Sequence, residues 1–135
     1  MSWEETRRIA EELTRRLKAG ASPNELAALC SADLDWNIPG DIGALPWIGQ
    51  KTGREAFADF IRDTRNLLEP LALKIVEIFA SEDRAVILGE LASKVKHTGR
   101  IVETAFAIVL TVSAGKINGF MMLEDSFSVS QAARP

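Results

Sequence analysis

The chain is 135 residues long, the size of a single domain, and its shares of hydrophobic (47%) and charged (26%) residues are those of an ordinary globular protein. It carries 16 basic and 19 acidic side chains, a net charge of −3, with no block of basic residues, so we expect no nucleic-acid partner. One cysteine and one histidine are too few for an intrachain disulfide or the usual zinc site, and no apolar run reaches the roughly 20 residues that cross a bilayer.

The remaining signals of compartment and cofactor are also negative. The N-terminal segment is unlike a signal peptide, and a single cysteine suits a reducing compartment. Glycine-rich phosphate loops, nucleophile elbows and dinucleotide fingerprints are missing. The sequence therefore predicts a cytoplasmic protein with no metal, no cofactor and no membrane partner.

The N-terminal residues predict a long amphipathic helix. Ser2 and Glu5 have the spacing of a capping box, and Leu13 and Leu17 recur on one face. Gly20 follows a basic last turn and is expected to stop the helix.

A second, short helix is expected from Ser22 to about Cys30, with Pro23 in its first turn. Cys30 lies among apolar residues, and no feature near it in the sequence would activate a thiol. We expect Cys30 to be a small buried side chain rather than a nucleophile.

A short strand is predicted over residues 33–38, and residues 40–51 are expected to form a loop. The loop holds Leu45 and Trp47, which are too apolar for a segment fully in water. We expect these side chains to close over a core or over the mouth of a cavity, where a loop of this kind would act as a lid.

A third helix is predicted to begin with a capping box formed by Thr52 and Glu55. Its apolar face includes Phe57 and Phe60. Pro70 is expected to end it, because proline lacks the backbone N–H that a helix interior needs.

From Leu71 onward the apolar residues change to a period of two, which predicts four successive strands. The strands are expected at residues 71–80, 85–95, 101–112 and 116–125. Short turns between them favour antiparallel pairing, and the whole pattern predicts an α+β domain over residues 1–126. Residues 127–135 are expected to be a frayed C-terminal tail.

Residues 105–110 are apolar at every position, although a half-exposed antiparallel strand should alternate. One face of this strand would pack on the helices. The other face is most simply covered by a second copy of the chain, which predicts a homodimer formed through the sheet.

Four segments resemble the nuclear transport factor 2-like superfamily, and most closely its SnoaL-like and limonene-epoxide-hydrolase-like branches. They are residues 33–40, the Thr-Gly-Arg-Glu-Ala-Phe run at 52–57, Thr-Gly-Arg at 98–100, and residues 115–125. The resemblance covers nearly the whole chain with the elements in the right order. It implies a cone-shaped, curved antiparallel sheet wrapped by three N-terminal helices, with an apolar pocket at the open end, usually in a dimer. Members of the superfamily include isomerases, cyclases, hydrolases and proteins without catalysis.

The catalytic residues of relatives are mostly replaced by apolar residues here. In the epoxide hydrolases of this fold, two carboxylates and an arginine surround a water and the epoxide. Ungapped counting places these three groups on Met122, Leu91 and Gly89. Asn37 matches the family's water-holding asparagine, and Asp35 stands where that family has a tyrosine.

The sequence also lacks residues that two other mechanisms of the superfamily require. The chain has no tyrosine, so the oxyanion hole of ketosteroid isomerases cannot form in its usual way. The histidine of SnoaL-like cyclases and hydroxylase relatives falls near Ile108. Asp35 remains as a carboxylate base in nearly the right place, with Asn37 beside it.

Asp35 and Asn37 are therefore the catalytic candidates, because they share strand parity and point to one face. In the alternative reading, Asp35 lies at the rim and Trp36 points into the core. The expected pocket lining consists of Trp36, Trp47, Phe60, Leu91, Phe106, Ile108, Met122 and Asp125. Glu124 and Asp125 end the last strand, where a structural role is expected, although Asp125 matches an acid common in the family.

Two functions remain open at this point. In the first, the chain binds an apolar or weakly polar small molecule in the cone and has an isomerase-, cyclase- or hydrolase-type activity that uses an acidic residue as base. In the second, it is a non-catalytic dimeric binding or interaction protein whose pocket is filled by side chains.

Overall fold

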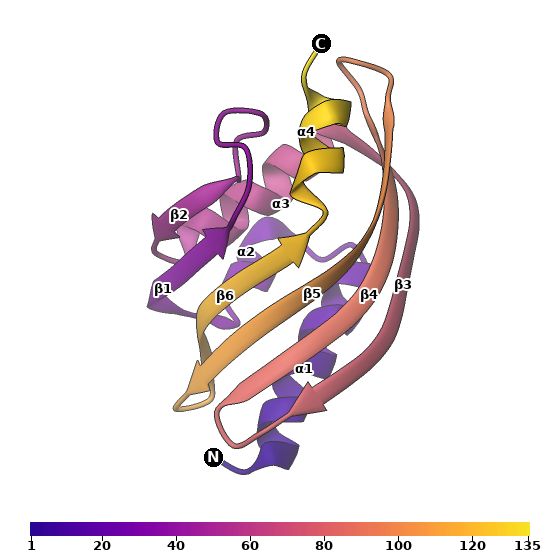
Figure 1. Cartoon of the computed structure of the whole chain (residues 1–135). Helices are drawn as coiled ribbons and strands as arrows, with labels where there is room; N and C mark the ends of the chain where they lie inside the picture. The colour runs from indigo at the N-terminus through magenta and orange to yellow at the C-terminus, as the bar shows by residue number, and fades with distance from the viewer.

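One curved, open sheet of six strands, in the order β2-β1-β6-β5-β4-β3, organises the chain (Figure 1). The computed structural model describes residues 1–135. The helices are α1 (Trp3–Lys18), α2 (Pro23–Ala27), α3 (Glu55–Leu67) and α4 (Ser126–Ala133). The strands are β1 (Cys30–Ile38), β2 (Gly49–Thr52), β3 (Leu68–Ala80), β4 (Arg84–Val95), β5 (Ile101–Ser113) and β6 (Lys116–Glu124).

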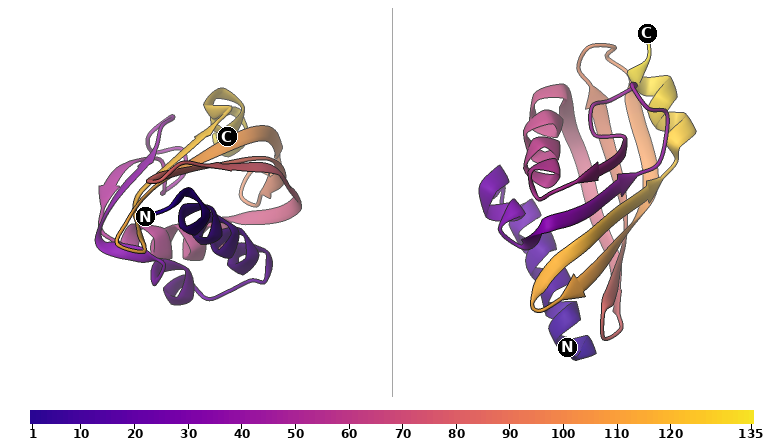
Figure 2. Two further views of the ribbon diagram at one scale, coloured as in Figure 1. Left: turned by 90° about the horizontal axis from the view of Figure 1, so that it is seen from below. Right: turned by 90° about the vertical axis from the view of Figure 1, so that its left-hand side faces the viewer.

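Helices α1, α2 and α3 cover one side of the sheet, whereas α4 lies apart from them beside the C-terminus (Figure 2). All strand pairs are antiparallel except β1 with β6, which is parallel. The predicted α+β fold with a curved sheet and three N-terminal helices is confirmed. None of the helices is both long enough and apolar enough to cross a membrane.

Helix α1 forms as its sequence predicts. The Ser2 side chain accepts a hydrogen bond from the Glu5 backbone N–H at 3.2 Å, and the reciprocal bond completes the capping box. Its buried face includes Ala10 and Leu13. The Thr6 hydroxyl donates to the carbonyl of Glu82 at 2.8 Å, so the helix is also tied to the β3–β4 turn.

Strand β5 alternates strictly between the two faces of the sheet. Phe106, Ile108 and Leu110 are buried under the helices, whereas Ala105 is exposed and Val109 is half-buried on the other face. The expectation that residues 105–110 present apolar side chains to both faces is therefore confirmed.

An aromatic cluster fills the core between β1, β6 and α3. The Trp36 ring stacks on Phe120 with centroids 4.4 Å apart, and the rings of Phe57 and Phe60 meet it at 5.8 and 5.1 Å. The indole N–H of Trp36 donates to the Trp47 carbonyl at 3.2 Å. This bond satisfies the one polar atom of a fully buried ring and fixes the β1–β2 loop over the core.

Both expected boundaries of α3 are wrong. Thr52 lies in β2 and caps nothing, and the helix follows Arg54 without a side-chain cap. Pro70 does not end the helix, which stops at Leu67. Pro70 lies inside β3, an edge strand, next to a bulge before Ala72. An edge strand tolerates proline because one side of it needs no ladder hydrogen bonds.

Two further expectations are corrected at the ends of elements. Cys30 begins β1 instead of ending α2, since the helix stops at Ala27. Cys30 is buried, and burial raises the pKa of its thiol to about 12, which agrees with the expectation that it is no nucleophile. The strand β2 was not expected.

The expected frayed tail over residues 127–135 is instead helix α4. The Asp125 side chain accepts from the Ser128 N–H at 3.1 Å and caps its first turn, and Val129 and Ala132 are buried. Long-range bonds hold the helix, including one from the Thr98 hydroxyl to the Ala132 carbonyl at 2.6 Å.

Candidate functional site

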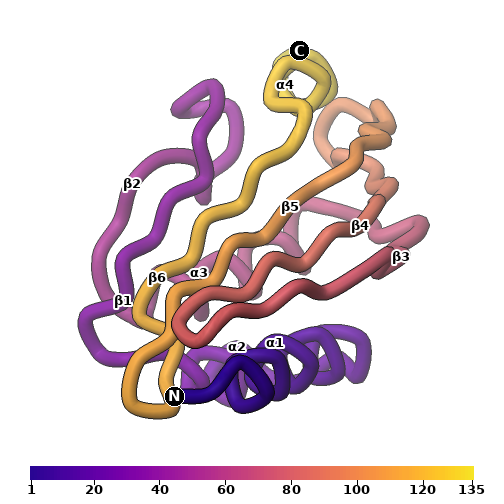
Figure 3. Tube along the Cα trace, turned by 60° about the horizontal axis from the view of Figure 1, so that its bottom comes forward, coloured from indigo at the N-terminus to yellow at the C-terminus, as the bar shows by residue number.

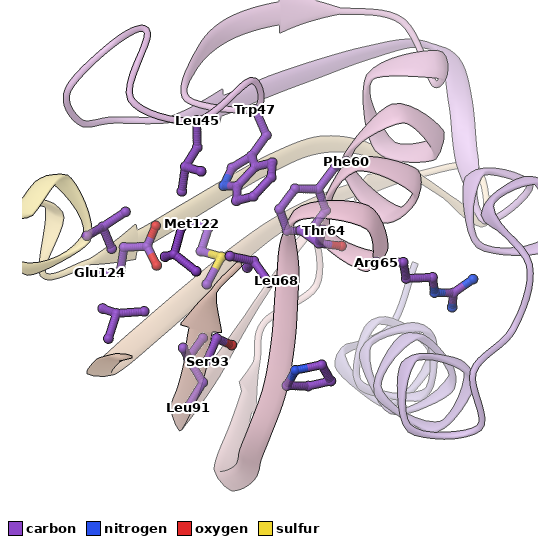
Figure 4. Close-up of a pocket in the computed structure, with 14 residues that line it drawn as sticks. Leu45, Trp47, Phe60, Thr64, Arg65, Leu68, Leu91, Ser93, Met122 and Glu124 are labelled. Atoms are coloured by element: carbon purple, nitrogen blue, oxygen red, sulfur yellow. The ribbon is translucent and has the colours of Figure 1, made fainter. Parts of the chain in front are cut away.

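A cavity of about 230 Å³ lies where α3, the β1–β2 loop and α4 meet the inner face of the sheet (Figure 4). Fourteen residues line it, and nine of these are hydrophobic, so its wall is mainly apolar. Leu45 and Trp47 come from the loop, Phe60 from α3, Met122 from β6 and Val129 from α4. We call this space the front cavity.

The β1–β2 loop covers the front cavity, as its apolar sequence predicts. Leu45 and Trp47 are buried, and Figure 4 shows both pointing into the cavity. The loop is tied to α4, because the Asp41 carboxylate accepts from the Ser130 hydroxyl at 2.6 Å and from Arg134 Nε at 2.7 Å. These contacts hold the loop in place over the front cavity.

Glu124, the last residue of β6, is the only carboxylic acid in the cavity wall. Figure 4 shows its carboxyl group directed toward Leu45 and Met122. It forms no hydrogen bond and no ion pair with any other side chain. Burial without a compensating partner raises its pKa from 4.5 to about 7. Both protonation states are therefore accessible near neutral pH.

No cation balances the charge of Glu124. Arg65 is among the lining residues, but its side chain extends away from the cavity and its guanidinium group donates to the Ala21 carbonyl at 2.6 Å (Figure 4). Ser93 and Thr64 are the only hydroxyl residues in the wall, and Thr64 already donates to the Ile61 carbonyl. A ligand would thus meet one carboxyl group and one free hydroxyl in an apolar space.

Strand parity explains why the Glu124 side chain points into the cavity, whereas that of the neighbouring Asp125 does not. Glu124 pairs with Phe106 and Met122 pairs with Ile108, so all four side chains point inward. Asp125 follows at the turn into α4 and is exposed. Its hydrogen bonds from the Ser128 backbone N–H and hydroxyl lower the pKa of its carboxyl. The predicted pocket residue Asp125 therefore caps a helix and does not line the cavity.

The structure does not bring Asp35 and Asn37 to the cavity. Asp35 is exposed and pairs with Gly119 and Thr52 on the outer side of the sheet, whereas Trp36 between them is fully buried. The alternative reading, with Trp36 in the core, describes the arrangement that forms. Trp36 packs on the lining residue Phe60 but does not itself line the front cavity.

The other predicted lining residues are found at or near the site. Trp47, Phe60, Leu91 and Met122 line the front cavity. Phe106 and Ile108 line a smaller cavity of about 130 Å³ farther inside the cone, which we call the rear cavity.

Glu124 is the site residue that the sequence reasoning missed, because it assigned a structural role to both acids at the end of β6. Counting from the Gly115 turn placed the family's acid on Met122. Glu124 lies two residues farther along the same face, so strand parity was the available signal. A bulge at Asn118, between the pairs Val112–Ile117 and Thr111–Gly119, interrupts any count made from that turn.

Comparison with known proteins identifies relatives of this fold. Residues 10–120 match the model of the SnoaL-like domain. The structure is similar to that of an NTF2-like protein from Burkholderia xenovorans LB400, with 24% identity, 99% of both chains covered and a TM-score of 0.87. No curated protein matches the chain.

Two other solved structures show the range of proteins with this fold. One is a candidate SnoaL-like polyketide cyclase from Mesorhizobium loti, with 19% identity, 85% of this chain and 95% of that chain covered, and a TM-score of 0.72. The other, from Catenulispora acidiphila DSM 44928, has a ketosteroid isomerase-like fold and is in complex with trimethylamine. It is 20% identical, with 83% of this chain and 82% of that chain covered and a TM-score of 0.66. At these identities the likeness shows the fold alone.

Proposed function

Because this chain belongs to the SnoaL-like domain family, we propose that it binds a small, largely apolar molecule in the front cavity and exchanges a proton with it through Glu124. The observation that carries the proposal is a carboxyl group directed into an apolar cavity with no cation beside it. Proton exchange of this kind is the chemistry of an isomerase- or cyclase-type enzyme. The similarity to a candidate polyketide cyclase agrees with this reaction class.

The environment of Glu124 suits a general base. Burial holds its pKa at about 7, so near neutral pH the carboxylate forms readily and still accepts a proton strongly. A carbon next to a carbonyl group is a fitting proton donor. Glu124 would take that proton, and the electron pair of the C–H bond would pass into an enolate.

The size of the front cavity limits the ligand. Its volume of about 230 Å³ is below the roughly 300–1,000 Å³ of typical ligand pockets. A small ketone, enone or lactone is therefore a better fit than a steroid.

Deuterium exchange with cyclohexanone and 2-cyclohexenone tests the proposal. In D₂O the protein is expected to exchange protons on carbons activated by the carbonyl group, detected by NMR, with a rate that rises with pH and levels off above about 7. Glu124→Gln removes the base and is expected to slow the exchange about 10²–10⁴-fold. Asp35→Asn, a matched change of an exposed acid outside the cavity, should leave the rate unchanged.

The outcomes separate the two functions. Exchange that is equally fast in the Glu124→Gln variant would overturn the role of Glu124. Binding of the ketones without exchange would reduce the protein to a binding protein. If neither ketone raises the melting temperature and neither exchanges protons, the proposal is overturned altogether.

We propose in addition that the outer face of the sheet binds a second copy of the chain. This outer face is the apolar patch on the side of the sheet opposite α1, α2 and α3, formed by Phe79, Val86, Leu88, Val109, Met121 and Leu123. Four of them, Phe79, Val86, Val109 and Met121, are successive cross-strand neighbours on β3, β4, β5 and β6. Phe79 is 51% and Leu123 is 43% exposed. Apolar patches that span several strands usually mark interaction sites.

A second copy is the occupant that the charges favour. The patch is bordered by both signs, with Lys74 and Lys94 near Glu90 and Glu103 on the same face. Such a border can meet its own copy across a two-fold axis without placing like charges opposite each other.

Leu123→Glu is expected to convert the dimer into a monomer, because it places a charge within the apolar contact. Light scattering after size exclusion would give the mass. Ile42→Glu is the control, since Ile42 is also an exposed apolar residue but lies in the β1–β2 loop, and this variant should remain dimeric. A wild-type mass of one chain would contradict the proposal.

A further inference from the structure

We infer that the rear cavity is a subsite for an apolar tail, so that the ligand is an elongated molecule with a carbonyl head at Glu124 and an alkyl or aryl tail directed toward α1. This inference rests on the proposed function of the front cavity and names its ligand class more closely. The rear cavity has a volume of about 130 Å³ and lies between α1, α3 and the inner face of β3–β6. Figure 3 shows how α1 lies across this end of the sheet.

The two cavities are neighbours in the same cone. Phe60, Leu91 and Met122 line both, so these three side chains form the partition between them. Met122 lies two residues before Glu124 on the same face of β6, which places the partition about 7 Å from the carboxyl-bearing residue. A methionine side chain is flexible and readily changes rotamer, so it can open such a partition.

The wall of the rear cavity accepts only apolar groups. Eleven of its twelve lining residues are hydrophobic. The exception is Thr14, whose hydroxyl donates to the Glu11 carbonyl at 2.8 Å within α1 and is therefore already used. A polar head in this space would lose its hydrogen bonds to water without replacement, whereas an apolar tail would not.

The packing around Gly89 keeps this space open. A methyl carbon placed on Gly89 would lie 2.3 Å from Cζ of Phe106, so the Phe106 ring lies directly over this residue on the neighbouring strand. With no side chain at this position, the ring lies against β4 instead of standing upright in the cone. The glycine thus makes room for the rear cavity.

The length of the tail follows from the two volumes. A methylene or carbonyl group occupies roughly 30 Å³, about the volume of one water molecule in the liquid. On this basis the front cavity holds about eight such groups and the rear cavity about four more. Each methylene group that enters an apolar site should strengthen binding about fourfold.

A homologous series of methyl ketones, from 2-butanone to 2-dodecanone, tests the inference by calorimetry. Affinity is expected to rise about fourfold per carbon beyond the eight or so groups that fill the front cavity, and to stop rising near twelve. Ile108→Phe and Ile75→Phe, which enlarge residues that line only the rear cavity, should each shorten this limit and leave 2-pentanone binding unchanged. Ile75→Phe is included because Ile108 is the more deeply buried residue, and a protein enlarged there is the more difficult of the two to fold.

Two results would overturn the inference. One is an affinity that stops rising at about eight groups in the wild type, and the other is a limit that neither phenylalanine variant shortens. If short ketones still bind and exchange through Glu124, the proposed function stands and only the tail subsite fails. If no ketone of any length binds, both fail.

Discussion

Raising the pH from 5 to 9 is expected to lower the free energy of unfolding by about 3 kcal/mol through Glu124 alone. The folded state holds the pKa of this carboxyl at about 7, against its ordinary value of 4.5, because burial penalises the charged form. The stabilising effect of the bound proton is complete below pH 4.5. It is lost progressively as the pH rises through 7, and stability is level above that value.

Urea unfolding of the wild type and of Glu124→Gln at several pH values would measure this effect. The glutamine variant stays neutral, so it should lack this contribution and be the more stable protein at pH 9. The difference between the two curves isolates Glu124 from every other titrating group. Curves that differ by a constant amount between pH 5 and 9 would contradict the prediction.

The loss of folding stability at acidic pH has a different origin. Hydrogen bonds from Arg134 and Ser130 lower the pKa of Asp41 to about 2. A depressed pKa stabilises the folded state above the ordinary value and is lost only as the pH falls toward 2. Measurements above pH 5 therefore avoid this contribution.

The size of the Glu124 effect bears on function. Small domains are stable by only about 5–15 kcal/mol, so an unpaired buried acid that removes about 3 kcal/mol at high pH is a large defect. A neutral residue in the same place would give a more stable protein. Retention of such a group is expected where it is used, as in the proton exchange proposed here.

Local patterns predicted most of the sheet and the longest helix. The capping box of Ser2 and the period of two from residue 71 onward both correspond to elements of the structure. They depend on neighbours in the sequence, so they can be interpreted without knowledge of the fold. Helix α4 and the position of Pro70 depend on contacts with distant segments and could not be interpreted in this way.

The candidate site could be predicted less well, because it depends on which face of a strand each residue occupies. Leu34, Trp36 and Ile38 alternate in β1 and are all fully buried, so Asp35 must point the other way. This signal was present in the sequence. The position of Glu124 required in addition that Asp125 be recognised as the cap of a helix that was not expected.

Gly89→Ala is expected to destabilise the protein by about 3 kcal/mol, the upper part of the range for overpacked cores. The added methyl carbon would lie 2.3 Å from Cζ of Phe106 and 2.7 Å from the carbonyl oxygen of Lys74, and both distances require the neighbour to move. Gly119→Ala is a matched control in β6, where the nearest atom is the Thr111 hydroxyl at 3.0 Å, and it should be less destabilising.

Thermal and urea unfolding would measure these changes, and a double-mutant cycle identifies their cause. If overlap with the ring is responsible, Gly89→Ala should be less destabilising in a Phe106→Leu background, because the smaller side chain leaves space for the methyl group. Equal destabilisation in both backgrounds would assign the effect to the Lys74 carbonyl. Gly89→Ala should also weaken the binding of long methyl ketones more than that of short ones, because the displaced Phe106 ring lines the rear cavity and would narrow it. Gly89 would then affect both the stability of the fold and the length of the ligand that the site accepts.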